Sequence, residues 1–179
     1  MEDSFSAGFL ALARHEFRRL KSLADKGIAQ VDPTNFFARS DGESNSIAIL
    51  VKHMSGNLRS RWTDFLTTDG EKPDRNRDTE FEVENSERAE HLMSEWEDCW
   101  NVLFNTLEEL TPSDLTRTIT IRGEEFLVYQ AITRQISHYA YHVGQIVMLA
   151  KRWRSGEWQT LSIARGKSEE FRANPEKYL

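Results

Sequence analysis

Four long segments of the chain repeat apolar residues at steps of three and four, the spacing that places side chains on one face of a helix. These segments are 5–24, 46–66, 86–110 and 128–153. Strands and helices do not alternate between them, so their apolar faces have to be buried against one another. The sequence therefore predicts an all-α four-helix bundle that forms a single domain over residues 1–179.

The ends of these helices and the segments between them carry further signals. The apolar stripe of the first helix is expected to contain Phe5, Phe9, Leu12, Leu20 and Leu23. Turn formers fill residues 31–45, so this connection holds at most a short helical turn. The helices after it are expected to be capped by Asn45 or Ser46 and by Ser86. Threonines alternate with Arg117, Ile119 and Ile121 before a turn at residues 122–123, which predicts a small β-hairpin between the third and fourth helices.

Composition and charge exclude several classes of protein. The formal charge of -6, with lysines and arginines scattered along the chain, disfavours nucleic acid binding. Cys99 is the only cysteine, which excludes an intrachain disulfide, and it is expected to pack in the core. No stretch is apolar enough to span a membrane, and the first residues lack the pattern of a signal peptide. We therefore expect a cytoplasmic protein.

Three histidines form the main candidate site. His138 and His142 are four residues apart, so on a helix their imidazoles project from one face about one turn apart. His53 interrupts the apolar stripe of the second helix, where a ring facing the interior needs a polar partner. Facing helices of a bundle can bring such rings to one divalent metal ion. Three histidine ligands would leave coordination positions open, as in catalytic sites.

Each of these histidines also has an ordinary interpretation. Two histidines four residues apart occur by chance, and a single histidine such as His53 is more often a core residue with a satisfied hydrogen bond. His15 and His91 lie among charged residues and are interpreted as surface residues.

Other polar residues are candidates for substrate binding or for orienting the site. Asn57 lies one turn beyond His53 and Arg134 one turn before His138, so both could face the same cavity. Arg134 either binds an anionic group or is a surface residue, and the second interpretation is the more common one. Further candidates are Gln145, Tyr139 and Tyr141.

Two charged features leave alternatives open. Glu16 interrupts the apolar stripe of the first helix, and it either reaches inward as a base or turns toward solvent. The polar stretch 67–85 has to lie over the surface, and at this length such a loop is often functional. Its Arg75 and Arg77 lie near Asp74 and Asp78, so the loop is either a lid over the site or a solvated turn that pairs its own charges. The tail 155–179 is expected to be irregular, packed on the bundle or on a second subunit.

The positions of the three histidines resemble those of the DinB/YfiT-like superfamily of proposed metalloenzymes, which carry one histidine on the second helix and an HxxxH pair on the last bundle helix. Three stretches extend the resemblance to a bacterial branch catalogued as a domain of unknown function: VKHMSGNLRSRWTDFLTTDGEKPDRNRD, RQISHYAYHVGQIVMLAKR and LSIARGKSEEF. The resemblance implies an up-down-down-up bundle, often a homodimer, in which His53, His138 and His142 bind nickel, zinc or a related ion.

Two functions follow as hypotheses. Characterised members of the superfamily include enzymes that use bacillithiol, mycothiol or glutathione as a thiol cosubstrate. The resemblance therefore implies a metal-dependent enzyme that activates a thiol or water, with thiol S-transfer as the best single expectation and a hydrolase as another. The alternative is a dimeric scaffold or small-molecule binding protein with a vestigial metal site. No residue of the sequence identifies the substrate.

Overall fold

The computed structural model describes residues 2–84 and 87–174. Within these ranges the chain forms six α-helices: α1 (Glu2–Ile28), α2 (Pro33–Phe37), α3 (Ile47–Trp62), α4 (Ala89–Glu109), α5 (Val128–Arg154) and α6 (Ser168–Ala173). The strands β1 (Thr118–Ile121) and β2 (Glu124–Leu127) pair in antiparallel fashion. The protein is thus mostly helical with one small hairpin, as the sequence predicts.

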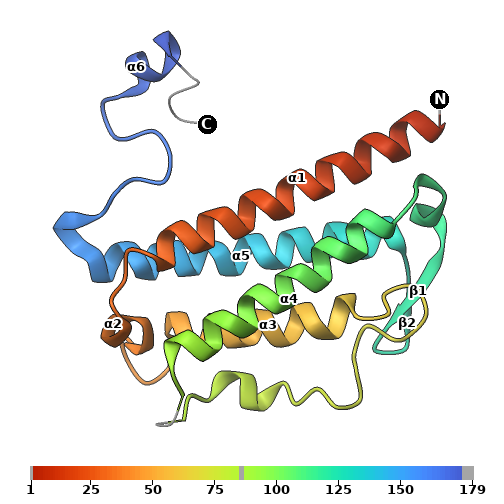
Figure 1. The fold of residues 1–179 in the computed structure, drawn as a ribbon, viewed down its shortest axis with the longest axis horizontal. Helices are drawn as coiled ribbons and strands as arrows, with labels where there is room; N and C mark the ends of the chain where they lie inside the picture. The colour runs from red at the N-terminus through yellow and green to blue at the C-terminus, as the bar shows by residue number, and fades with distance from the viewer. Residues whose placement is uncertain (1, 85–86, 175–179) are drawn as a thin grey trace.

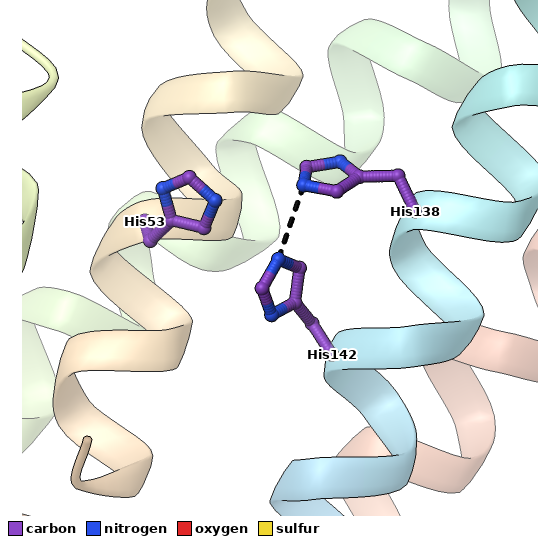
Figure 2. Close-up of side chains that lie close together, drawn as sticks. All are labelled: His53, His138 and His142. Carbon is purple, nitrogen blue, oxygen red and sulfur yellow. Dashed lines mark hydrogen bonds between the residues drawn. The ribbon is translucent and has the colours of Figure 1, made fainter. Parts of the chain in front are cut away.

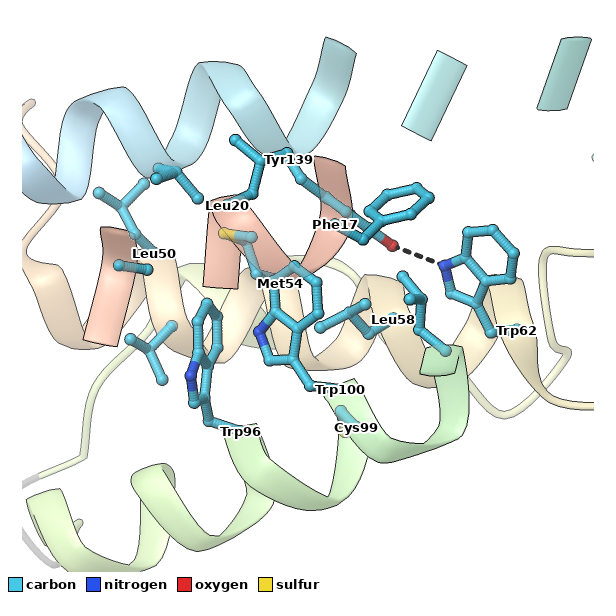
Figure 3. Close-up of a cluster of buried hydrophobic side chains, with 14 of the residues drawn as sticks. Phe17, Leu20, Leu50, Met54, Leu58, Trp62, Trp96, Cys99, Trp100 and Tyr139 are labelled. Carbon is cyan, nitrogen blue, oxygen red and sulfur yellow. Dashed lines mark hydrogen bonds between the residues drawn. The ribbon is translucent and has the colours of Figure 1, made fainter. Parts of the chain in front are cut away.

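The four long helices enclose one apolar core. Helix α1 packs along α5 and α3 packs along α4, while α3 also contacts α5 (Figure 1). The core includes fully buried aromatic side chains, among which the rings of Trp96 and Trp100 meet edge to face. The indole of Trp62 donates a hydrogen bond of 3.1 Å to the Tyr139 hydroxyl, which joins α3 to α5 inside this core (Figure 3). Cys99 is buried in the same cluster, as expected.

The buried face of α1 differs from the predicted stripe. Of the predicted stripe, Leu20 is buried and Phe9 and Leu23 are partly buried, but Phe5 and Leu12 are 78% and 58% exposed. The buried face is formed by Leu10, Ala13, Phe17, Leu20, Ala24 and Ile28. Both sets of residues follow a helical spacing, so periodicity alone could not choose between them. The helix also continues to Ile28, four residues beyond the predicted end at Ala24.

The ends of the other helices correct some predictions and confirm others. The Ser46 side chain accepts a hydrogen bond from the Ile49 amide and caps α3, which ends at Trp62 rather than near Leu66. Helix α4 begins at Ala89 without a side-chain cap, and the predicted cap Ser86 lies outside the described residues. The short turn expected before residue 45 is α2, and α5 has the predicted extent to within one residue.

The hairpin lies over the ends of α3 and α5 and is tied to the polar loop 67–84. Arg122 and Gly123 form its turn with positive φ angles of 58° and 74°. The Asp69 carboxylate accepts hydrogen bonds from both of these backbone amides, at 2.9 and 2.8 Å. The loop is therefore fixed to the hairpin at one end, close to α3.

The tail is partly ordered on the bundle. The backbone amide of Gln159 donates to the Gln30 side chain at 2.7 Å, which joins the start of the tail to the end of α1. The later helix α6, which the expectation of an irregular tail missed, lies away from the long helices (Figure 1). Of the helices that the structure describes, none is long and apolar enough to cross a membrane.

Candidate metal centre

The three predicted histidines lie together between α3 and α5. His53 projects from α3 toward His138 and His142 of α5 (Figure 2). One ring nitrogen of each residue lies within 4.8 Å of the others, and the Nε2 atoms of His138 and His142 are 3.0 Å apart. His53 and His142 are buried, and His138 is partly buried. The three histidines are therefore close enough to hold a metal ion.

The chemistry of this donor set fits a divalent transition metal. Burial, together with the charges of the adjacent His142 and His53, lowers the pKa of His138 to about 3. Burial also lowers the pKa of His142. Both effects favour neutral imidazole, the form that coordinates metal. With metal–nitrogen bonds near 2.0–2.1 Å, two ligands of a tetrahedral ion lie roughly 3.3 Å apart. The His138 and His142 nitrogens, 3.0 Å apart, would therefore separate slightly, and the wider spacings of up to 4.8 Å would contract.

A buried carboxylate orients His53. Glu80, in the 3-10 turn Asp78–Phe81, accepts a hydrogen bond of 2.8 Å from His53 Nδ1. Because an ionised carboxylate only accepts, His53 carries its proton on Nδ1 and presents the lone pair of Nε2. Burial opposes ionisation of Glu80, but the hydrogen bonds from His53 and Arg75 hold its pKa below the usual value. Partners of this kind fix the ring of a metal-binding histidine.

The position of Glu80 depends on Arg75 and Gly56. The Arg75 guanidinium donates to both carboxylate oxygens of Glu80, at 2.8 and 2.9 Å, and also contacts Glu71. Gly56 of α3 faces Glu80, and a Cβ atom at this glycine would lie 2.2 Å from Glu80 Oε1. The absence of a side chain at Gly56 thus leaves room for the carboxylate beside His53, which lies three residues before Gly56 on the same helix.

The polar loop therefore differs from its prediction. It does pair its own charges, but Arg75 contacts Glu71 and Glu80 instead of Asp74 or Asp78. Glu80 is only 6% exposed, so the loop buries charged groups against α3 rather than lying wholly over the surface. Sequence reasoning missed Glu80, because it lies in a segment without helical or strand periodicity.

Two of the three proposed substrate-binding residues hold other side chains in place. Gln145 Oε1 lies 2.9 Å from His142 Nδ1 and orients that ring. Asn57 accepts a hydrogen bond of 3.0 Å from the Tyr139 hydroxyl, which continues the contact between Tyr139 and Trp62. Tyr139 is completely buried in the core, so it supports Asn57 and does not line the site.

A cavity of about 450 Å³ opens onto the histidines. Its wall includes Asn57 and Arg134, together with the exposed Tyr141. Arg77 and Phe81 also line it, so the polar loop forms one wall of this cavity. The size falls within the usual range of small-molecule sites, about 300–1,000 Å³.

The remaining candidates lie elsewhere. Glu16 pairs with Arg19 on the surface of α1, so its outward alternative is correct. His15 and His91 are exposed, as predicted. Cys99 lies in the core, where burial raises the pKa of its thiol. None of these side chains lines the cavity beside the histidines.

Comparison with known proteins identifies the family of the chain but does not assign it an activity. No curated protein and no solved structure matches the chain. A family described as a protein of unknown function, DUF1572, matches residues 4–167, which include all three histidines and the residues that orient them. The chain therefore belongs to the DUF1572 family.

Proposed function

We propose that the protein is a metal-dependent enzyme that activates a thiol or a water molecule, with thiol S-transfer as its reaction. The observation that carries this proposal is the cluster of His53, His138 and His142, whose ring nitrogens lie within 4.8 Å of one another at the wall of a cavity. Three protein ligands leave open coordination positions, and the cavity gives a small molecule access to them.

The arrangement of the helices supports membership of the DinB/YfiT-like superfamily. In Figure 1, α1 and α5 run in one direction, and α3 and α4 run in the opposite direction. These directions support the proposed up-down-down-up bundle, in which α2 and the hairpin would be additions. The histidines also lie on the second and last of the four long helices, as in that superfamily.

The ion we propose is zinc or nickel, since neutral imidazoles are good ligands for both. When bound, such an ion would lower the pKa of a coordinated thiol or water and so supply a nucleophile at neutral pH. Glu80 and Gln145 would keep the Nε2 lone pairs of His53 and His142 directed into the site. Asn57 offers an amide for binding the substrate next to His53.

We also propose that the protein is a homodimer that associates through α1 and α5. Among the described residues, four of the six exposed large hydrophobic side chains lie on these two helices outside the cavity: Phe5, Leu12, Tyr129 and Met148. We propose that these side chains form one contiguous apolar patch, the kind of surface that marks protein–protein contacts.

The test of the enzymatic proposal is thiol turnover by the zinc- or nickel-loaded protein. Bacillithiol, mycothiol and glutathione would be offered with an aryl halide. In this reaction a carbon–sulfur bond forms, the carbon–halide bond breaks, and the thiol proton passes to solvent. We expect turnover above the uncatalysed rate that His138→Ala abolishes and that His91→Ala, at an exposed histidine, leaves unchanged.

Absence of turnover with every thiol, in protein that binds metal, would contradict S-transfer. Hydrolysis of activated esters by the same metal-loaded samples would then distinguish a hydrolase from a binding protein with an inactive metal site.

A further inference from the structure

The cavity beside the histidines is strongly basic. Its wall contains Arg61, Arg75, Arg77, Arg122 and Arg134, and among the residues that the structure describes no aspartate or glutamate lines it. This is unexpected in a chain with 29 acidic and 23 basic residues and a formal charge of -6. Since the histidines add no negative charge, the cavity presents a positive surface to any molecule that reaches them.

Two carboxylates behind the wall form ion pairs with three of these arginines. Arg61, Arg75 and Arg122 each lie within 3.3 Å of the Glu71 carboxylate, and Arg75 also contacts Glu80. These arginines are committed to holding the polar loop on α3 and on the hairpin.

Arg77 and Arg134 have no such partner among the residues that the structure describes. Each guanidinium instead lies over an aromatic ring, Arg77 at 4.8 Å from the centre of Phe81 and Arg134 at 5.7 Å from that of Phe126. Such stacking limits the motion of the side chain but leaves its N–H groups free to bind an anion.

Both arginines line the same cavity as the three histidines. The Phe81 ring, which supports Arg77, packs 4.8 Å from the ring of His53. Arg134 lies one turn before His138 on α5. The two unpaired charges therefore approach the histidines from two different elements, the polar loop and α5.

The cavity wall also contains buried polar atoms without partners. Gln135 is 3% exposed and its Oε1 atom has no hydrogen-bond partner within the described part of the chain. Arg61 is 4% exposed, and its Nε atom also has no hydrogen-bond partner there. Burying an unpaired polar atom is unfavourable, so such atoms in a cavity wall are available to bond to a ligand or to water.

We infer that the cavity binds a small organic molecule that carries an oxyanion, either a carboxylate or a phosphate, which pairs with Arg77 and Arg134. A donor group of the same molecule would bond to Gln135. This inference rests on the proposed function, in which the reactive end of the substrate lies at the three histidines, and it adds the chemical class of that substrate.

The test uses calorimetric titration of the full-length protein after removal of metal with a chelator, so that an anion cannot bind through an ion. The probes are succinate and inorganic phosphate, which distinguish a carboxylate site from a phosphate site, and the neutral succinamide. The variant is Arg77→Gln/Arg134→Gln. Its control is Arg18→Gln/Arg152→Gln, which removes two exposed arginines that also lie over aromatic rings but are outside the cavity.

We expect succinate or phosphate to bind and succinamide not to bind. The Arg77→Gln/Arg134→Gln variant should weaken anion binding by about tenfold or more for each arginine, since a hydrogen bond to a charged group contributes about 1.5–3 kcal/mol. The control variant should stay close to the wild type. Equal weakening in both double variants, binding of succinamide as tight as that of succinate, or no binding of either anion would overturn the inference.

Zinc binding by the same samples, measured separately, keeps the two proposals apart. The arginine variants should still bind zinc through the histidines. A protein that binds anions but no zinc would contradict the proposed function alone, and one that binds zinc but no anion would contradict this inference alone.

Discussion

Replacing Gly56 with alanine should displace the carboxylate that orients His53. A Cβ atom at this position would lie 2.2 Å from Glu80 Oε1 and 2.7 Å from its Cδ atom, whereas real Cβ contacts essentially never fall below 3.0 Å. The carboxylate would have to withdraw by about 1 Å to restore van der Waals contact. A shift of this size breaks the 2.8 Å contact with His53 Nδ1 and disturbs the bonds from Arg75.

The expected effects can be estimated separately for folding and for metal binding. Overpacking a buried site costs about 1–3 kcal/mol, and exchanging glycine for alanine within a helix returns about 1 kcal/mol. We therefore expect Gly56→Ala to lower the free energy of unfolding by up to about 2 kcal/mol. Zinc affinity should fall by about 10- to 100-fold, as when the partner of a metal-binding histidine is lost.

The assay combines urea denaturation of the metal-free protein with zinc titration against a competing chelator. The matched control is Gly144→Ala on α5, where a Cβ atom would meet nothing within 4 Å. It should be neutral or stabilising and bind zinc normally. In a Glu80→Ala background, Gly56→Ala should have no further effect on zinc affinity, because no carboxylate remains to be displaced. A Gly56→Ala protein as stable as Gly144→Ala, with unchanged zinc affinity, would refute this reasoning.

Three further predictions concern the core, the loop and the proposed dimer. Trp96→Ala removes a completely buried indole and should lower the free energy of unfolding by about 3–5 kcal/mol in urea denaturation, without changing zinc uptake. Burial opposes ionisation of Asp69, but hydrogen bonds from backbone amides lower its pKa to about 2. Because the pKa of Asp69 is lower in the folded than in the unfolded protein, Asp69→Asn should be about 1 kcal/mol less stable than the wild type at pH 7. This difference should disappear as the pH falls from about 4 to about 2, and a difference independent of pH would contradict the prediction. Leu12→Glu, at a side chain that is 58% exposed, should change stability by less than about 0.5 kcal/mol but shift the proposed dimer to monomer in sedimentation analysis.

The parts of the site that lie on long helices could be predicted from the sequence. His138 and His142 are one turn apart on α5, so a single helix fixes their relation. His53 was recognisable because a polar ring in an apolar stripe requires a partner. Helical periodicity also located α3, α4 and α5, whose buried stripes face a shared core.

The supporting residues could not be predicted, because their roles depend on contacts between distant segments. Glu80 is 27 positions from His53, in a loop whose path is set by ion pairs with Arg75 and by the attachment of Asp69 to the hairpin. Gly56 resembles any glycine within a helix until the position of Glu80 is known. For α1, two helical stripes overlap in the sequence, and only the packing against α5 shows which one is buried.

The most direct test of the central claim is equilibrium zinc binding by untagged protein, compared with His142→Ala and with His91→Ala at an exposed histidine. A site of three histidines predicts about one bound ion per chain in the wild type and in His91→Ala, and strongly weakened binding in His142→Ala. Nickel should give the same pattern. Unchanged zinc binding in His142→Ala, or no binding of either ion by the wild type, would contradict the account.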